Sequence, residues 1–507
     1  MSASNNILII KNGEAVSLDK IPLYNYSDFS TEVRRLLNEL QNHCAAYYAF
    51  RNKQDLHFIM VIADDKNHDI ALLSHHLSAD DKQQLDSLSQ HIFALHIFER
   101  EIHENFGVDF TNHPWQKPVR FAFNRADQNI KVNDYPFYSI KSEELHEVGV
   151  GPIHAGVIEP GHFRFICNGE KVLHLEIQLG WQHRGVEQLF LDKKKNLQRN
   201  ILAENIAGDT VIGHTSTFAQ VMEVLSEKTI SEQTQIERAL ALELERIAIH
   251  TGDISALCTD VAYNLGANVF GILRTGIINF TQAWCGNRFG KSLIRIGGNH
   301  FPFTEELKQQ LISVLDAYEK QFDEMAHLTF RLPSVENRFD NIGNISTKQA
   351  QLIGSVGLSA RMSGIERDIR VSHPTLAYRK FPYKTITGEK GDVFARFLLK
   401  RKEIKASIAW IRNLLENYQF KTSNTENPNY NLALKTNHFA ISLTEAWRGE
   451  VCHCAITNDV GELMHYKVKD PSMHNWKSLE LSLRNVEISD FPINNKSYNL
   501  SYCGHDL

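Results

Sequence analysis

Short apolar runs alternate with amphipathic stretches in the first part of the chain. The runs Cys44–Phe50 and Leu56–Asp64 are rich in aromatic and β-branched residues, which is typical of β-strands. Apolar residues recur at helical spacing in residues 30–41 and 77–106, so the pattern predicts a helix in each stretch. This mixture of strands and helices predicts an α+β module at residues 1–122.

Residues 123–147 interrupt this pattern. They have no sustained apolar period and are rich in Asn, Asp, Lys and Glu, which is typical of a linker. After the linker, helical periodicity dominates in residues 229–255, 347–369 and 393–418. The sequence therefore predicts a second domain of a different type.

Two local signals refine the second domain. Thr229 followed three residues later by Glu232 predicts a capping box at a helix start. The apolar runs 450–457 and 463–468 are separated by the turn-forming sequence NDVGE, which predicts a β-hairpin. Residues 148–507 are therefore expected to form a mainly α-helical domain with a small β-ribbon.

Charge and composition exclude several classes of protein. The 507 residues carry a formal net charge of −6, which gives no electrostatic reason to expect a nucleic-acid partner. No apolar run approaches the ~20 residues of a membrane-spanning helix, and the first residues show no targeting pattern, so we expect a cytoplasmic chain. The seven scattered cysteines are expected to be reduced. Without a glycine-rich phosphate loop or a Cys-x-x-Cys motif, neither NAD nor an iron-sulfur cluster is expected on this chain alone.

Several ordered motifs carry a family resemblance. The run FEREIHENFGVDFTNHP (98–114) resembles the 30-kDa subunit of respiratory complex I, and GPIHAGVIEPGHFRF (151–165) with LEIQLGWQHRGVEQL (175–189) resembles the 49-kDa subunit. The resemblance is stronger still to the large subunit of group 4 nickel-iron hydrogenases of the formate hydrogenlyase and hydrogenase-4 kind, in which the two domains are fused in this order. Further matches are LERIAIHTGD, RIGGN, SARMSGIERDIR and GDVFARFLLK. The resemblance covers essentially the whole chain.

The resemblance also identifies the positions where a metal centre would be held. In the hydrogenases, two Cys-x-x-Cys pairs supply the thiolates that bind nickel and iron. The matching positions are Ala207 and Thr210 for the first pair, and Cys503 and Asp506 for the second. Alanine has no donor atom and a threonine hydroxyl is a poor ligand for a soft metal. The resemblance therefore implies that the metal site is lost and that the chain is not an active hydrogenase.

Two interpretations of Cys503 stay open. The favoured one is a small buried hydrophobe, which is how most free cysteines behave. The other is a different metal site with His505 and Asp506, joined by Cys452, His453 and Cys454 if the β-ribbon folds nearby. Against this second interpretation, two cysteines at a spacing of two simply share one face of a strand.

Complex I offers another use of the cavity, since its 49-kDa subunit binds quinone there beside a small iron-sulfur subunit. By resemblance, His162 matches the histidine that binds one quinone carbonyl, and His154 lies in the same loop. The family tyrosine that binds the other carbonyl has no counterpart near Ala207. His214 is a further candidate for the cavity wall. Loop histidines often only bind backbone carbonyls, and this alternative stays open.

The segment with His183, Arg184 and Glu187 faces the partner's iron-sulfur cluster in the family. The resemblance implies that Arg184 places a positive charge near that cluster and that Glu187 carries protons. Arg184 and Glu187 are expected to share one helical turn. The alternative for Glu187 is an ion pair that orders the fold. Structural ion pairs are also expected within Arg361–Arg370 and between the ends of Asp392–Arg396.

The leading hypothesis is a subunit of a membrane-associated oxidoreductase complex that binds no cofactor alone. A small iron-sulfur partner subunit would transfer electrons, antiporter-like membrane subunits would move ions, and the chain would sit peripherally on the cytoplasmic face of the inner membrane. The alternatives are a quinone-reductase subunit of the NADH dehydrogenase kind and a non-catalytic structural subunit. An open cavity lined by His162, Glu187 and His214 would favour chemistry, whereas a filled one would favour a scaffold.

Overall fold

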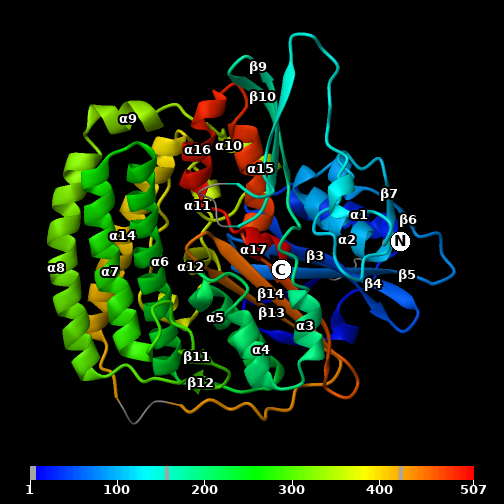
Figure 1. The fold of residues 1–507 in the computed structure, drawn as a ribbon. Helices are drawn as coiled ribbons and strands as arrows, with labels where there is room; N and C mark the ends of the chain where they lie inside the picture. Colours follow the sequence, from blue (N-terminus) through cyan, green and yellow to red (C-terminus); the bar gives the residue numbers. More distant parts are fainter. Residues whose placement is uncertain (1–6, 155–158, 422–425) are drawn as a thin grey trace.

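The computed structural model describes residues 7–154, 159–421 and 426–507. Figure 1 shows a bundle of long helices on one side, a sheet in the centre and the N-terminal module on the other side. The expected fold class, an α+β module followed by a mainly helical domain, is confirmed.

An antiparallel sheet in the order β1-β5-β4-β3 forms the N-terminal module. α1 and α2 cover one face of this sheet, where Phe29, Phe58 and Phe98 are fully buried. Burying such aromatic side chains removes large apolar areas from water and stabilises the module. The two strands predicted here are confirmed. The elements are β1 (Leu8–Ile10), α1 (Tyr26–Leu37), β3 (Asn42–Asn52), β4 (Asp55–Asp64), β5 (Asp69–Leu77), α2 (His96–Phe106) and β7 (Asp109–Thr111).

The prediction of one helix over residues 77–106 is wrong for its first part. That part contains β6 (Gln84–Asp86), which pairs with β7, and two 3-10 turns. The buried carboxylate of Glu99 accepts hydrogen bonds from Ser87 Oγ (2.6 Å) and from the backbone N–H of Leu88 (2.7 Å). Bonds from a side chain to the backbone compete with helical hydrogen bonding, so they hold this segment in turns.

The predicted β-hairpin is confirmed, but it belongs to a larger sheet than a ribbon. The order is β15-β14-β13-β2, so the N-terminal strand β2 pairs with a strand near the C-terminus. One face packs on the N-terminal sheet around Tyr48 and Ile441, and the other packs around Phe218 and Tyr466. Burial on both faces explains why the sequence of β14 shows no alternation. The strands are β2 (Ala15–Ser17), β13 (His438–Glu445), β14 (Glu450–Thr457) and β15 (Leu463–Lys469).

Four long helices form the bundle: α6 (Glu232–Asp260), α7 (Asn264–Cys285), α8 (Glu305–Thr329) and α14 (Val393–Asn417). Their apolar faces meet in a core that includes Leu244, Phe270 and Phe322. The helix predicted over 393–418 is confirmed. The capping box predicted from Thr229 is wrong, because Ser231 accepts the backbone N–H at the start of α6.

The helix predicted over residues 347–369 is broken into two short helices, α10 (Thr347–Leu352) and α11 (Leu358–Arg361). Gly354 and Gly357 lie between them with φ angles of +70° and +61°. Glycine adopts this left-handed region readily, and the helix therefore ends before the chain turns toward the central sheet.

The remaining elements connect these layers. β8, β9 and β10 form an antiparallel sheet at one end, α15 packs on the C-terminal helix α17, and α9 lies on the other side of the molecule beside the long helices. They are β8 (His146–Val150), β9 (His162–Asn168), β10 (Lys171–Gln178), α3 (Val186–Asp192), α4 (Asn196–Ala203), α5 (Val211–Leu225), β11 (Ile294–Arg295), β12 (Gly298–Asn299), α9 (Pro333–Phe339), α12 (Ile369–Ser372), α13 (Leu376–Lys380), α15 (Ser472–Ser482), α16 (Phe491–Tyr498) and α17 (Tyr502–Asp506).

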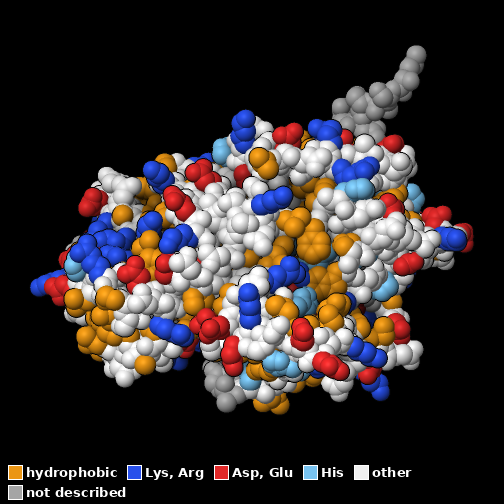
Figure 2. Space-filling view, turned by 90° about the horizontal axis from the view of Figure 1, so that it is seen from above, with side chains coloured by type: hydrophobic (Ala, Val, Ile, Leu, Met, Phe, Trp, Pro, Cys, Tyr) orange, Lys and Arg blue, Asp and Glu red, His pale blue; other side chains and the backbone are white. Residues whose placement is uncertain are grey.

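The end of the molecule that carries β9 and β10 has a mixed surface. Figure 2 shows apolar side chains gathered near the middle of this end, beside lysine and arginine side chains. Trp115, Tyr138 and Leu352 line a groove of about 480 Å³. Within the described residues, every helix is too short or too polar to cross a lipid bilayer.

Candidate functional site

The C-terminal helix α17 is fixed in the interior by hydrogen bonds to the segment before α3. Asp506 is fully buried, and its carboxylate oxygens accept the backbone N–H groups of Gly180 and Gln182 at 2.8 Å each. The carbonyl oxygen of Leu507 accepts the N–H of Arg184 at 2.7 Å. Asp506 therefore holds the backbone at the position where the resemblance places a metal ligand.

An arginine lies against Thr210, a second predicted ligand position. Arg448 donates two hydrogen bonds of 2.7 Å to the carboxylate of Asp209 and one of 3.0 Å to Thr210 Oγ. Its guanidinium also stacks on Trp447, 3.9 Å from the ring centroid, and donates to the carbonyl of Asn499. Burial lowers the pKa of Arg448, but the neighbouring Asp209 carboxylate outweighs burial and raises it above its ordinary value.

The remaining ligand positions offer little to a metal. Ala207 is fully buried and carries no donor atom. Burial raises the pKa of the Cys503 thiol to about 12, with Glu159 acting in the same direction, so the thiol stays protonated at neutral pH. Cys503 is also the one sulfur at the four matched positions, whereas a nickel-iron centre needs several soft thiolates. A nickel-iron centre therefore does not fit this set of side chains.

His214 belongs to a buried row of polar side chains next to α17. Its Nε2 lies 3.1 Å from Asp470 Oδ2 and its Nδ1 lies 3.1 Å from His453 Nε2, while His453 Nδ1 lies 2.9 Å from Tyr466 Oη. A Cβ atom built on Gly504 would lie only 2.6 Å from the Asp470 carboxylate, so α17 packs directly on this row. Every ring nitrogen of the two histidines is engaged within the chain.

Glu187 is held by a buried lysine. Its carboxylate lies 3.0 Å from Lys467 Nζ and accepts the N–H of Val468 at 2.9 Å. Lys467 also donates to Glu101 at 2.5 Å, and Arg120 forms an ion pair with the carboxylate of Glu101. Burial lowers the pKa of Lys467 to about 8, although Glu187 opposes that shift. These contacts join α3, β15 and α2, and so connect the second domain to the N-terminal module.

His183 and Arg184 lie at the surface beside α17. His183 Nδ1 is 2.8 Å from the carbonyl oxygen of Asp506. Arg184 donates to the carbonyls of Asn205, Ile206 and Cys503 at 2.6, 2.8 and 2.9 Å. The expectation that Arg184 and Glu187 share a helical turn is wrong, because Gly185 has a φ of +68° and α3 begins after it. Three carbonyls thus fix the guanidinium in place. Phe123, whose ring centroid lies 4.9 Å from that of His183, is exposed, and so are Leu197 and Ile201 of α4.

His154 and His162 flank a loop whose residues 155–158 lie outside the described residues. His162 Nδ1 is 3.1 Å from the carbonyl oxygen of Gly151, and its Nε2 is buried without a hydrogen-bond partner among the described residues. Both ring nitrogens of His154 are likewise buried and unpartnered there. Burial lowers the pKa of His162, which favours the neutral ring. His162, Glu187 and His214 thus have separate partners rather than one shared set of contacts.

The proposed second metal site does not form. Cys452 and Cys454 lie on one face of β14, with their sulfurs 3.8 Å apart, and contribute to the core against the N-terminal sheet. His453, between them, points to the opposite face and contacts His214. In the described residues, we find no group of three or more His, Cys, Asp or Glu side chains placed to hold a metal ion.

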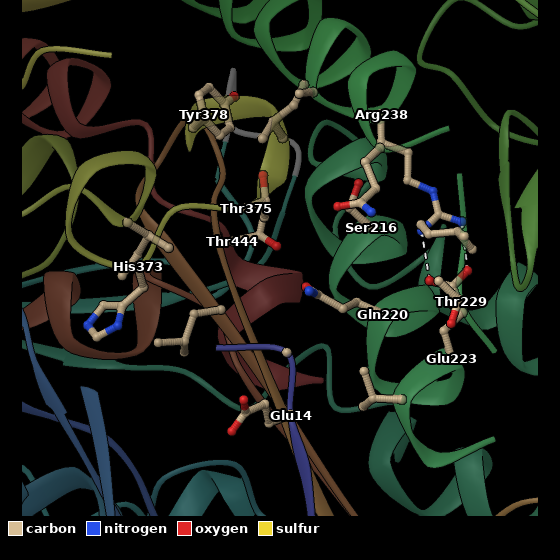
Figure 3. Close-up of a pocket in the computed structure, with 18 of the residues that line it drawn as sticks. Glu14, Ser216, Gln220, Glu223, Thr229, Arg238, His373, Thr375, Tyr378 and Thr444 are labelled. Atoms are coloured by element: carbon tan, nitrogen blue, oxygen red, sulfur yellow. Dashed lines mark hydrogen bonds and ion pairs between the residues drawn. The ribbon is translucent and has the colours of Figure 1, made fainter. Parts of the chain in front are cut away.

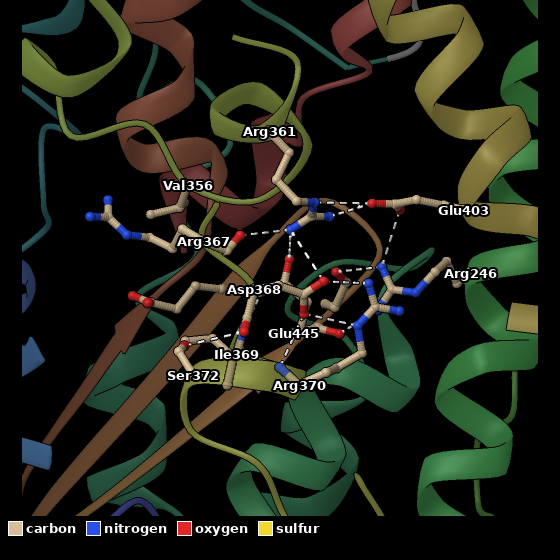
Figure 4. Close-up of polar contacts among 12 residues, drawn as sticks. Arg246, Val356, Arg361, Arg367, Asp368, Ile369, Arg370, Ser372, Glu403 and Glu445 are labelled. Carbon is tan, nitrogen blue, oxygen red and sulfur yellow. Dashed lines mark hydrogen bonds and ion pairs between the residues drawn. The ribbon is translucent and has the colours of Figure 1, made fainter. Parts of the chain in front are cut away.

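A fully buried ion network lies between α6, α14 and the central sheet. Figure 4 shows Arg361 between Glu403 and Glu445, at 2.6 Å from each. Glu403 also lies 2.8 Å from His250 Nε2 and 3.7 Å from Arg246. Arg361 holds the pKa of Glu403 well below its ordinary value, although burial acts in the opposite direction.

The charged motif 361–370 contributes to this network as expected. Arg370 lies 2.7 Å from Asp368 and 3.1 Å from Glu243, so it connects the motif to α6. The expected pair within 392–396 is wrong. Asp392 instead caps α14 by accepting the N–H of Ala395 at 2.7 Å.

Comparison with known proteins identifies the parts of the chain. The family pattern described as "Respiratory-chain NADH dehydrogenase, 30 Kd subunit" matches residues 27–125, and that described as "Respiratory-chain NADH dehydrogenase, 49 Kd subunit" matches residues 269–506. The chain fuses a 30-kDa and a 49-kDa complex I domain. This confirms the family resemblance seen in the sequence motifs.

Relatives of the fused complex I domains include hydrogenase subunits. Hydrogenase-4 component G of Escherichia coli (strain K12) is 25% identical over 75% of this chain and 65% of its own length, so the match spans about two thirds of that relative. The carbon monoxide-induced hydrogenase of Rhodospirillum rubrum is 28% identical over 69% of this chain and 95% of its own length. An NADH-quinone oxidoreductase polypeptide of Phocaeicola vulgatus is 24% identical over 72% of this chain and 76% of its own length.

A solved structure shares the fold. A chain of the membrane-bound sulfane sulfur reductase, an archaeal respiratory membrane complex, superposes with a TM-score of 0.66 at 20% identity. The superposition covers 73% of this chain and 100% of that chain.

Sequence reasoning missed the residues that engage the predicted site. Arg448 lies in the connection between β13 and β14, and Lys467 and Asp470 lie at the end of the sequence, far from Thr210, Glu187 and His214. Only the folding of the central sheet brings them together. The one signal available was the occurrence of lysine and aspartate in an otherwise strand-forming run at 463–470, because a charge in a buried strand requires a partner.

Proposed function

We propose that this chain is a subunit of a membrane-associated oxidoreductase complex related to complex I and to energy-converting hydrogenases. It holds no nickel-iron centre, and electrons pass through an iron-sulfur cluster of a small partner subunit. Antiporter-like membrane subunits couple this transfer to ion translocation. The chain is peripheral, on the cytoplasmic face of the inner membrane. Its relatives support this proposal, because they belong to hydrogenases and NADH-quinone oxidoreductases.

The observation that carries the loss of the metal is the contact between Arg448, Asp209 and Thr210. A guanidinium stays protonated at all physiological pH values, so it repels a metal cation and satisfies the carboxylate beside it. Cys503 is the one thiol left at the four matched positions. The pairing of Arg448 with Asp209 and Thr210 thus supports the proposed loss of the metal.

The chain's own residues would position charge for the partner's cluster. Three carbonyl oxygens fix the Arg184 guanidinium, and His183 is fixed by the carbonyl of Asp506. A fixed positive charge near a cluster raises its reduction potential. Glu187 and Lys467 lie 3.0 Å apart, so a proton can reside on the carboxylate or on the amine of this pair.

Specific observations favour each of two other candidates. The ring nitrogens of His154 and His162 that have no partner among the described residues favour a quinone site beside these two side chains. Glu187 is paired with Lys467 and His214 with Asp470, which favours a structural subunit, because both side chains already have partners within the chain. The three candidates differ in what a change at His162 would do.

The test uses the complex isolated from its native membranes through a tag on this chain. We expect a small iron-sulfur subunit and membrane subunits to copurify, and the complex to transfer electrons. Electron transfer to a soluble quinone is then compared between the wild type, His162→Ala and the control His91→Ala, which changes an exposed histidine of the N-terminal module. A loss confined to His162→Ala supports the quinone candidate. A complex without iron-sulfur subunits would contradict the proposal and leave the structural candidate.

A further inference from the structure

A cavity of about 630 Å³ lies along α5, away from the positions matched to metal and quinone ligands. Figure 3 shows its walls, which come from α5, α6, the end of β13, the segment of α12 and α13, and the chain entering β2. Cavities that bind small organic molecules range from about 300 to 1,000 Å³, so this one is large enough for such a ligand.

Neutral hydrogen-bond donors face this cavity without a partner. Ser216 Oγ is buried and has no partner in the described part of the chain. Gln220 accepts a hydrogen bond from Ser442 Oγ at 2.7 Å through Oε1, whereas its Nε2 donates none to a described residue. Figure 3 shows the amide of Gln220 directed into the space toward Thr444. Ser216 Oγ is buried without a hydrogen bond, so a ligand that accepts from it supplies a bond that the described chain does not, and Gln220 Nε2 lines the same cavity as a second donor.

The charged residues of the walls are already paired. Arg238 binds both oxygens of Glu223, at 2.8 and 3.0 Å, and Lys435 lies 2.7 Å from Glu227. The Lys435–Glu227 pair is exposed, but a charged ligand inside the cavity would have to break the buried Arg238–Glu223 pair or remain without a counter-charge, and both are costly there. At the exposed rim, Glu14 accepts a backbone N–H from its own turn. The walls therefore favour an uncharged ligand.

Part of the lining is apolar and includes Val224, Ala239, Leu242, Ile369 and Leu443, while polar side chains such as Thr229, Thr375 and Tyr378 line other parts. An apolar wall opposite a pair of neutral donors fits a molecule with two unlike sides. We propose that this cavity binds a neutral ring compound that carries carbonyl oxygens on one edge. The oxygens accept from Gln220 Nε2 and Ser216 Oγ, and the ring packs on Leu242 and Leu443. The proposal does not depend on the proposed function.

The first experiment measures binding of a named probe to the full chain. Lumichrome is an uncharged three-ring compound with two carbonyl oxygens, and its fluorescence reports binding. We expect saturable binding to the wild type. Gln220→Glu keeps the acceptor for Ser442 but replaces the free donor, so its affinity should fall by at least about tenfold, while Ser216→Ala should lose about three- to tenfold.

Two controls make the result decisive. Gln54→Glu adds the same charge at an exposed hairpin turn and should bind as the wild type does. His162→Ala changes the candidate quinone loop and should also leave the affinity unchanged. Absence of saturable binding to the wild type, an unchanged affinity in a folded Gln220→Glu variant, or a loss in His162→Ala would each overturn the proposal.

Discussion

The start of α5 and its middle satisfy their polar groups in opposite ways. Thr210, just before the helix, receives a hydrogen bond from Arg448, whose charge is balanced by Asp209. Ser216, less than two turns into the helix, is buried with no partner among the described residues, and Gln220 directs a free amide into a cavity. At the start of α5 the polar groups are paired with one another, whereas at its middle they line the cavity proposed to bind a neutral ligand.

If the metal site is lost as proposed, this difference means that Thr210, one of the matched positions, has gained a polar partner and is not left unpaired. Beside Thr210, one of the positions matched to a lost ligand, the chain has the buried guanidinium of Arg448, which donates hydrogen bonds to Asp209, Thr210 and the carbonyl of Asn499. Removing one partner of such a buried pair leaves the other uncompensated, which is costly. Removing an unpartnered hydroxyl leaves nothing uncompensated. The two regions should therefore respond very differently to substitution.

The largest effect is expected in the closed ion network. Glu403→Gln leaves Arg361, which is fully buried, without one of its two nearest carboxylates. We expect the free energy of unfolding to fall by about 3–5 kcal/mol, measured by denaturant titration. The matched control is Asp323→Asn, whose partner Lys405 is 49% exposed, and this should cost about 0–1 kcal/mol. Equal decreases in the free energy of unfolding of the two variants would contradict the claim that burial makes the loss of an ion-pair partner costly.

Arg448→Met should have the next largest effect. It removes the charge-assisted hydrogen bonds to Asp209 and Thr210 but keeps an apolar side chain against Trp447. Asp209 is only partly buried and regains some hydration, so we expect a loss of about 2 kcal/mol in denaturant titration. A variant as stable as the wild type would show that Arg448 does not hold this region closed.

The pH dependence of stability tests Lys467. Its pKa in the folded chain is about 8, against about 10.4 when unfolded. Between these values the unfolded chain binds a proton that the folded chain does not, so this residue makes stability rise with pH. Relative to Lys467→Met, the wild type should gain up to about 1.4 kcal/mol per pH unit in this window. Parallel curves for the two proteins would contradict the lowered pKa.

The smallest effect is expected in the open region. Ser216→Ala removes a hydroxyl that has no partner among the described residues, so the free energy of unfolding without ligand should stay within about 0.5 kcal/mol of the wild type. Thermal unfolding with and without lumichrome separates this from binding. A loss as large as that in Arg448→Met would mean that Ser216 is engaged, and would remove the contrast between the two regions.

Much of the fold could be predicted from sequence because periodicity reports burial. The strands around Tyr48 and Ile59 and the long helix α14 lie where predicted. The predictions failed where side chains take over backbone hydrogen bonding, as Glu99 does, or where glycines such as Gly354 end a helix. Local periodicity cannot reveal either effect when the partner is distant or the backbone angle is unusual.

For the candidate site, the sequence could predict which residues occupy the matched ligand positions, but not which side chains contact them. The motifs placed Thr210 and Cys503 at the lost ligand pairs, but did not reveal that Arg448 would bind Thr210. That contact spans 238 residues of sequence and depends on the turn between β13 and β14. Pairing of Glu187 with Lys467 likewise depends on how α3 packs on β15.

The central claim is that an arginine ion pair has replaced the metal site. The most direct test is the nickel and iron content per copy of this chain, in the complex isolated from native membranes. The account predicts iron, carried by a partner subunit, without nickel. Nickel at about one atom per chain would contradict it, because no thiolate set for that metal exists among the described residues that flank Arg448.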